Sequence, residues 1–263
     1  MDDHSGRIPA PAAGTIRDEA ARVCSAAGRL PGAARRSFIA GRFIGSLDQF
    51  HDVHAAVQSG SVAIFLESKA GREHLTEVLA PGACIGRHAA SSGVGERCKL
   101  VALEPAVVLE VPMDSYLELL SRDSGLAAAA AGIKAWQHAM LLRRLTVLHL
   151  QTPPERVAAA LLYLTTLLAT RCPLARGSHV RLSQSTIAAT AGLGRQSANR
   201  ALRQLAHSRL IHVERGFLCV LRPEALGRVV SGGVLGQPEG GPTTCKLRTP
   251  LVRLTCPTSS EDG

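Results

Sequence analysis

The chain has 263 residues, which suits one large domain or two modest ones. Hydrophobic residues make up 46% of it and aromatic residues only 3%, so a core can form but must be largely aliphatic. No apolar run reaches the roughly 18 to 20 residues of a membrane span, and the polar start does not resemble a signal peptide. We therefore expect a cytoplasmic protein without a membrane partner.

Positive charge is concentrated in one part of the chain. The formal net charge is +9, and residues 151–228 alone carry eleven arginines against three acidic side chains. A basic patch that is confined to one segment indicates a polyanionic partner. The alternative is a solvated surface that happens to be rich in arginine.

The seven cysteines are scattered and form no CxxC pair; they are Cys24, Cys84, Cys98, Cys172, Cys219, Cys245 and Cys256. This pattern is typical of reduced, mostly buried thiols in a cytoplasmic protein. A metal or iron–sulfur site needs clustered ligands, so we predict no metal centre.

The first half of the chain predicts an arm followed by a small β-domain. Residues 1–36 form the expected arm, which is mobile and has one or two helical turns around residues 17–26. Residues 37–124 contain short β-branched runs that glycine separates, and this spacing predicts an antiparallel barrel or roll. Its clearest hairpin joins residues 61–66 to residues 74–79. The other expected elements are a hairpin turn at residues 69–71, strands at 99–103 and 107–111, and a short helix at 114–120.

A long helix is expected over residues 125–151. Its apolar side chains recur every three or four residues, and they are Leu126, Ala129, Ile133, Trp136, Met140, Leu141, Leu145 and Leu148. Such a stripe can pack into the core of one chain or form the seam of a dimer. Both interpretations remain open at this point.

The next segment, residues 152–229, predicts a compact helical unit. Thr152 and two prolines begin a helix that we expect to reach about Arg171, and residues 210–213 and 217–220 predict a two-stranded wing. A final helical turn follows at residues 223–229. Residues 230–263 are rich in glycine, proline and polar side chains and predict a disordered tail.

Between these elements, residues 182–205 (LSQSTIAATAGLGRQSANRALRQL) predict a helix, a glycine turn and a second helix. Ser183 can cap the first helix. In the second helix, Ala198, Ala201, Leu202 and Leu205 share an inward side, and Arg195, Gln196, Asn199, Arg200 and Arg203 are left for the outward side. A helix that presents Arg and Gln near its N-terminus is suited to reading base edges in the major groove of DNA.

This order of elements resembles the cyclic-AMP receptor protein (Crp/Fnr) superfamily of bacterial transcription regulators. The resemblance extends over residues 48–226 and is carried by residues 59–71 and 79–86 of the roll and by residues 182–205. It implies an α+β fold with an N-terminal antiparallel β-roll of the cyclic-nucleotide-binding type, a long dimerisation helix and a C-terminal winged helix-turn-helix. It also implies a homodimer on a near-palindromic site of double-stranded DNA, and contact with RNA polymerase.

The resemblance assigns DNA contacts to individual residues. Arg195, Gln196 and Arg200 occupy the positions that touch bases in the family. Glutamate is usual where Gln196 stands, and glutamine pairs well with adenine, so we predict a half-site that is altered at that base. The candidates for phosphate contacts are Ser183, Gln184, Ser197 and Arg203, although Arg203 can equally be a solvated arginine.

The effector site departs from the family pattern. Gly86 and Arg97 match the phosphate cassette of cyclic-nucleotide-binding members, but Arg87 replaces the ribose-binding glutamate and Cys98 replaces a small hydroxyl residue. Arginine has no acceptor atom for a ribose hydroxyl. The long helix also lacks the polar pair that meets the purine, since residues 140–142 are Met-Leu-Leu. The pattern therefore disfavours cyclic AMP in the usual pose and leaves the effector unknown.

Several alternatives stay open for the roll. An anionic ligand can bind Arg87 and Arg97, or the roll can serve as a scaffold for a regulator without any ligand. His74 or His88 can ligate haem, but a lone histidine is more often an ordinary surface residue. Thiol sensing by Cys84 or Cys98 requires an exposed thiolate.

Catalysis is not expected, because the chain has no GxSxG, P-loop, HExxH or paired-carboxylate motif. The leading hypothesis is a sequence-specific regulator. The alternative is a ligand-binding or interaction module that binds DNA only non-specifically. The outward Arg195, Gln196 and Arg200 favour the first, because non-specific binding does not require such a set on one helix.

Overall fold

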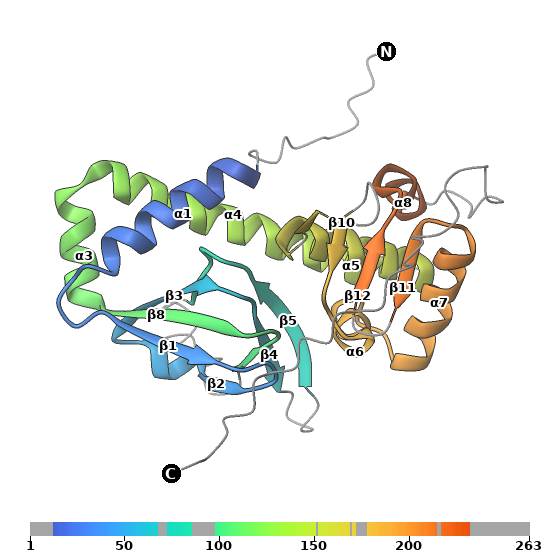
Figure 1. Cartoon of the computed structure of the whole chain (residues 1–263), viewed down its shortest axis with the longest axis horizontal. Helices are drawn as coiled ribbons and strands as arrows, with labels where there is room; N and C mark the ends of the chain where they lie inside the picture. Colours follow the sequence, from blue (N-terminus) through green and yellow to red (C-terminus); the bar gives the residue numbers. More distant parts are fainter. Residues whose placement is uncertain are drawn as a thin grey trace, which may run out of the picture.

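The computed structural model describes residues 13–67, 73–85, 98–150, 152–168, 170–171, 178–214 and 217–231. Within these ranges the chain forms a β-roll and a helical unit, and a long helix runs between them (Figure 1). The predicted turns at 69–71 and 215–216, the tail from residue 232 and the effector candidates Gly86, Arg87 and Arg97 lie outside the described residues.

Two four-stranded antiparallel sheets build the roll, with strand orders β1-β8-β3-β6 and β2-β7-β4-β5. Their strands are β1 (Ala34–Phe38), β2 (Phe43–Ser46), β3 (Val53–Ser59), β4 (Val62–Glu67), β5 (Glu73–Leu79), β6 (Cys84–Ile85), β7 (Cys98–Ala102) and β8 (Ala106–Pro112). The predicted hairpin is confirmed, because β4 pairs with β5 from Val62↔Leu79 to Glu67↔Glu73. Aliphatic side chains such as Val57, Val62, Leu100 and Val108 are fully buried and fill the roll.

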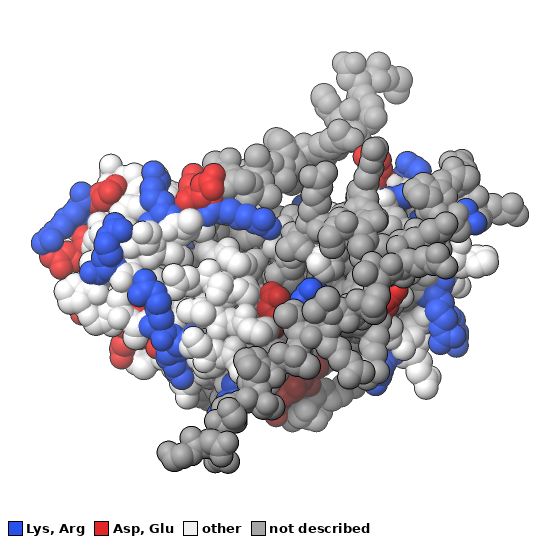
Figure 2. Space-filling model, viewed as in Figure 1, with Lys and Arg blue, Asp and Glu red and all other residues white. Residues whose placement is uncertain are grey.

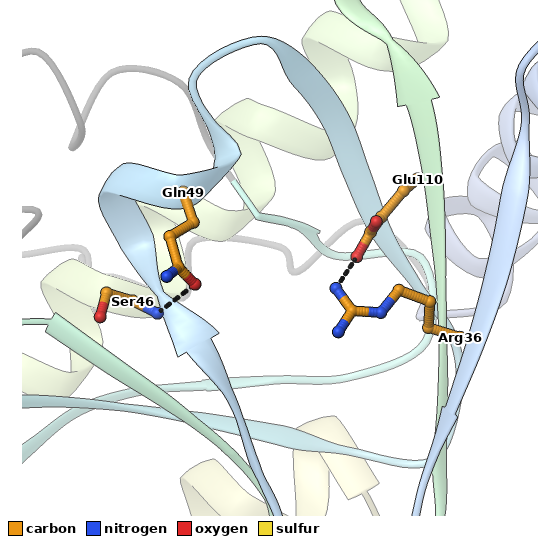
Figure 3. A network of polar contacts seen from close by, with 4 residues as sticks. All are labelled: Arg36, Ser46, Gln49 and Glu110. Carbon is orange, nitrogen blue, oxygen red and sulfur yellow. Dashed lines mark hydrogen bonds and ion pairs between the residues drawn. The ribbon is translucent and has the colours of Figure 1, made fainter.

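Polar contacts on the surface of the roll complement this core (Figure 3). Arg36 on β1 donates from Nη1 to Glu110 Oε1 on the paired strand β8 at 3.1 Å. The backbone N–H of Ser46 donates to Gln49 Oε1 at 3.2 Å, where the 3-10 helix η1 (Leu47–Phe50) begins. Exposed ion pairs of this kind contribute at most about 1 kcal/mol, so the aliphatic interior holds the roll together.

The N-terminal helix α1 (Ala13–Ala27) corrects the expectation of a mobile arm with one or two helical turns. Ala20, Val23 and Ala27 recur on one side of the helix, and their side chains are at most 3% exposed. This side packs on α4 and on strands β6 and β8 of the roll. Figure 1 shows α1 running beside α4. Strand β1 also begins at Ala34, inside the expected arm.

The helices of the roll and of its connection to the second unit follow the sequence closely. They are α3 (Met113–Arg122), α4 (Ser124–His149) and α5 (Pro153–Leu168). Helix α5 ends three residues before the expected Arg171, because Thr170–Arg171 form the short strand β9. All helices among the described residues fall short of a membrane span in length or in apolar character.

The stripe of α4 divides into two parts. Leu126, Ala129, Ile133 and Met140 are buried against the same chain. Further along, Leu145 and Leu148 of the stripe are 46% and 40% exposed, and Leu142 beside the stripe is 51% exposed. Core packing thus accounts for the stripe as far as Met140, and leucines after Met140 present an apolar surface to solvent.

The C-terminal unit is a winged helix-turn-helix, as predicted. Its elements are β10 (Ser178–Val180), α6 (Gln184–Thr190), α7 (Arg195–His207), β11 (Ile211–Glu214), β12 (Phe217–Val220) and α8 (Pro223–Val230). The wing β11–β12 is part of a four-stranded sheet with β10 and β9, two strands that were not predicted from the sequence.

Candidate nucleic-acid interface

Helix α6 begins and ends with two local motifs that the sequence predicts. The Ser183 Oγ accepts a hydrogen bond from the backbone N–H of Thr186 at 3.0 Å, which is an N-cap. At the other end, the N–H of Leu193 donates to the Ala188 carbonyl and the N–H of Gly192 donates to the Ala189 carbonyl. With Gly192 at φ +60°, this is a Schellman motif, and it sets the turn before α7.

Two arginines from other helices hold this turn, and sequence reasoning missed both. Arg156 on α5 donates from Nε to the Ala191 carbonyl at 2.9 Å and from Nη2 to the Gly192 carbonyl at 2.8 Å. Arg144 on α4 donates to the Ala189 carbonyl at 3.1 Å. Orphan carbonyls at the end of a helix attract cations. The only sequence signal for Arg156 is an isolated arginine in a helix of mostly alanine and leucine.

Helix α7 separates a buried side from an exposed one. Ala198, Ala201, Leu202 and Leu205 are at most 2% exposed and pack into the core of the unit. Arg195, Gln196 and Arg200 are exposed at its N-terminal half. Figure 2 shows basic side chains on the surface over α7, at the right-hand edge of the view. The arrangement leaves long hydrogen-bonding side chains free to reach a partner beside the helix.

The candidates for phosphate contacts lie at the starts of α6 and α7 and in a groove beside the wing. Ser183, Gln184 and Ser197 are exposed in the first turns of α6 and α7 or directly before them. Arg203 lies further along α7 and lines an open groove of about 470 Å³, together with Gln184 and the wing strand β11. The structure thus brings Gln184 and Arg203 together.

Asn199 differs from its predicted outward position. Its side chain is half-buried, and its Oδ1 is buried without a hydrogen-bond donor among the described residues. It lines the same groove, between α7 and the wing strand β11. Asn199 therefore does not belong to the exposed set of Arg195, Gln196 and Arg200.

Cys98 is the effector candidate that the structure describes. It begins β7, is 6% exposed and packs in the interior of the roll. Cys84 on β6 is equally buried, and burial raises the pKa of its thiol, which Lys134 lowers to a smaller extent. A buried thiol with a raised pKa stays protonated, which argues against thiolate sensing at Cys84. Of the two histidines considered as haem ligands, His74 lies within the described residues, and it is an exposed residue of β5.

Polar side chains of α4 contact the backbone of the roll. Gln137 accepts from the Cys84 N–H at 3.0 Å and donates to the Cys84 carbonyl at 3.1 Å, and Lys134 donates to the same carbonyl at 3.3 Å. Burial raises the pKa of the nearby Glu77 carboxyl, although Lys134 and Gln137 act in the opposite direction. Within the described residues, no group of His, Cys, Asp and Glu side chains is placed to hold a metal ion.

Two family models match the sequence. The model described as the cyclic nucleotide-binding domain matches residues 35–123, and the model described as the Crp-like helix-turn-helix domain matches residues 155–229. The first match covers the roll and α3, and the second covers α5 to α8. No curated protein matches the chain significantly.

Solved structures share the whole arrangement. A transcriptional regulator of the CRP family from Thermus thermophilus is 20% identical with a TM-score of 0.60, over 78% of this chain and 98% of its own. FixK2 from Bradyrhizobium japonicum is 20% identical with a TM-score of 0.60, over 74% and 96%. A cyclic nucleotide-binding domain containing protein from Listeria monocytogenes is 15% identical with a TM-score of 0.67, over 78% and 99%. At such identities the likeness shows a shared fold.

Proposed function

Because the chain belongs to the cyclic-AMP receptor protein (Crp/Fnr) superfamily of transcription regulators, we propose that it binds DNA sequence-specifically as a homodimer on a near-palindromic site. The observation that carries this proposal is helix α7, which buries its alanines and leucines and exposes Arg195, Gln196 and Arg200. The family consists of regulators rather than enzymes, so the conclusion concerns binding and not catalysis.

In this proposal α7 lies in the major groove. Arg195 and Arg200 each make a bidentate contact to O6 and N7 of a guanine, and Gln196 contacts N6 and N7 of an adenine. Ser183, Gln184, Ser197 and Arg203 contact phosphates and thereby set the register of the helix. The Oγ of Ser183 accepts from the Thr186 N–H and lies 2.9 Å from Thr186 Oγ1. When the Thr186 hydroxyl is the donor of that second bond, the Ser183 hydroxyl hydrogen can turn to a phosphate oxygen.

The exposed leucines of α4 support the homodimer. Leu142, Leu145 and Leu148 recur every three residues on the part of α4 that leaves the roll (Figure 1). Two copies of this surface bury their apolar side chains against each other in a two-fold seam. The seam presents two α7 helices to half-sites about one DNA turn, roughly 34 Å, apart.

The roll is the proposed sensory domain, and its effector is unknown. Gly86, Arg87, Arg97 and Cys98 form the candidate pocket, where two arginines favour an anionic ligand. We further propose the division into a roll that begins with β1 at Ala34 instead of at residue 37, a dimerisation helix (125–151), a winged helix-turn-helix (152–229) and a tail (230–263). A regulator of this kind acts in the cytoplasm and contacts RNA polymerase.

The proposal is tested by selecting binding sites from a random DNA pool with the purified protein, first without ligand and then with cyclic AMP. We expect enrichment of one near-palindrome. Arg195→Ala and Arg200→Ala each lose about 1–3 kcal/mol of discrimination, which is about 5- to 150-fold in relative affinity. Arg228→Ala, an exposed arginine on α8, serves as the control and leaves selectivity unchanged.

The outcomes separate the proposed function from its alternative. Binding without enrichment in either condition, with an affinity that merely falls as salt rises, indicates a non-specific module. Selective binding that survives both substitutions means that α7 is not the reading helix. Enrichment only with cyclic AMP would show that the roll accepts the nucleotide despite Arg87 and Cys98.

Gln196 provides a second test of the same helix. Gln196→Glu replaces an adenine-reading amide with a carboxylate, which accepts a hydrogen bond from N4 of cytosine. We expect the selected half-site to change from adenine to cytosine at one position and to stay constant elsewhere. A change at several positions, or at none, contradicts the assigned contact.

A further inference from the structure

A buried arginine lies where the roll, α4 and the helix-turn-helix meet. The side chain of Arg144 on α4 is almost inaccessible, since the residue is 2% exposed. Its Nη2 donates to the carbonyl of Leu75 at 3.1 Å and to the carbonyl of Ala189 at 3.1 Å. It forms no ion pair with a described residue, and its Nε and Nη1 are buried without a hydrogen-bond partner there.

The two carbonyls belong to different domains. Leu75 is a residue of β5, the strand at the edge of the sheet β2-β7-β4-β5. Ala189 is in the last turn of α6, directly before the turn that leads to α7. One guanidinium therefore connects the edge of the roll with the helix that supports α7.

The surfaces around Arg144 are packed together. Leu75 and Val78 of β5 belong to the same hydrophobic cluster as Val157 and Leu164 of α5 and Ile187 of α6. The Val78 N–H also donates to the hydroxyl of Tyr163 on α5 at 3.4 Å. The helix-turn-helix unit is thus seated on β5, and side chains of α4 and α5 hydrogen-bond backbone groups of this edge strand.

Stability alone does not explain an arginine at this place. A buried charge without a carboxylate partner carries a large desolvation cost, and apolar residues of similar volume are often as stable or more so. The contacts that Arg144 does make are directional and charge-assisted, and such bonds define a geometry. A geometric role therefore fits this residue better than a stabilising one.

We propose that Arg144 is a positioning residue, which fixes the orientation of the helix-turn-helix unit against β5 and so places α7 for DNA. This inference rests on the proposed function.

The test compares Arg144→Gln with Arg143→Gln in the full-length protein. Arg143 is the neighbouring residue, and it is exposed. Hydrogen–deuterium exchange of the backbone amides measures how well the contact between β5 and α6 is protected. Strand β8 serves as an internal reference for the roll. We expect Arg144→Gln to raise exchange by tenfold or more in residues 73–79 and 184–193 and to leave β8 unchanged. Arg143→Gln behaves as the wild type.

DNA affinity is the second readout. A unit that is no longer held against β5 must be ordered when it binds, so we expect Arg144→Gln to weaken binding to the selected site about tenfold. If Arg144→Gln does not fold, Arg144→Lys replaces it, since lysine keeps the charge but lacks the planar fork that joins both carbonyls. It then shows the same changes to a smaller extent.

Each other outcome overturns the proposal. Unchanged exchange in β5 and α6 means that Arg144 does not hold these two elements together. A rise in exchange that extends to β8 means that Arg144 is only a core residue. Tighter DNA binding by Arg144→Gln means that the orientation of the helix-turn-helix unit against β5 opposes DNA binding. Arg195→Ala in the DNA-binding assay tests the proposed function separately. If α7 does not contact the bases, this variant binds DNA as the wild type does, and the exchange result for Arg144→Gln is unaffected.

Discussion

Arginine side chains have two different environments in this protein, and exposure distinguishes them. Arg195 and Arg200 are exposed on α7, where they can contact a partner. Arg144 and Arg156 instead donate to backbone carbonyls at the end of α6 and in the turn that follows. Arg156 is half-buried and donates to these carbonyls, so part of the charge excess of residues 151–228 lies at the turn after α6 and not on the exposed side of α7.

At the same scale, His54 makes the stability of the protein depend on pH. Its ring stacks on Tyr116 with the centroids 3.6 Å apart, and the residue is 7% exposed. Burial, together with a smaller effect of the Lys134 charge, lowers the pKa of His54 from 6.5 to about 3. The imidazole is neutral in the folded protein, whereas in the unfolded chain it takes up a proton below about pH 6.5.

The contribution of neutral His54 is thus complete above about pH 6.5 and is lost as the pH falls toward 3. Between pH 6 and 4 we expect the wild type to lose up to about 1.4 kcal/mol of unfolding free energy per pH unit relative to His54→Phe, which keeps an aromatic ring. Denaturant unfolding at several pH values and one protein concentration measures this difference. Parallel pH curves for the two proteins would contradict it, and the exposed His138→Gln serves as the control.

At the scale of elements, the turn between α6 and α7 depends on a residue without a side chain. Gly192 has φ +60°, and a Cβ atom there would lie 2.6 Å from Arg156 Nη2 and 2.7 Å from Leu148 Cδ2. L-residues with a Cβ are disfavoured in this region by about 1–2 kcal/mol, and the two close neighbours add steric strain.

We therefore expect Gly192→Ala to lower the unfolding free energy by at least about 1 kcal/mol, or the melting temperature by about 2–4 °C. Gly227→Ala is the matched comparison, because Gly227 lies inside α8 with open space around its Cα. Alanine favours the helical state there, so this variant gains up to about 1 kcal/mol. Calorimetry of both variants decides the matter, and equal melting temperatures would refute the strained-turn argument.

At the scale of the whole molecule, α4 connects the roll to the helix-turn-helix unit and carries an exposed apolar surface near its C-terminal end. Its N-terminal half is buried by the roll and α1, but Leu142 and Leu145 are about half exposed. An apolar surface that recurs along a helix in this way is typical of an interface.

Replacing both leucines, as Leu142→Glu with Leu145→Glu, places like charges in the proposed seam. We expect the mass from light scattering to fall from that of two chains to that of one. Leu117→Glu, at an equally exposed leucine on α3, retains the mass of two chains. A double variant that stays at the mass of two chains would place the dimer interface elsewhere.

Local motifs explain which parts the sequence by itself determined. The cap at Ser183, the Gly192 turn, the two-sided α7 and the β4–β5 hairpin all depend on residues within a few positions of one another. Hydrophobic periodicity and turn chemistry operate over the same short range, so these elements and the exposure of Arg195, Gln196 and Arg200 could be predicted.

Only the tertiary structure decided the rest. The packing of α1 on α4, the addition of β9 and β10 to the wing sheet, and the inward position of Asn199 depend on neighbours that are distant in sequence. The same holds for Arg144, whose two acceptors lie 69 and 45 residues away. An arginine in a sequence carries no sign of whether it will meet solvent or a carbonyl, because burial is a property of the assembled chain.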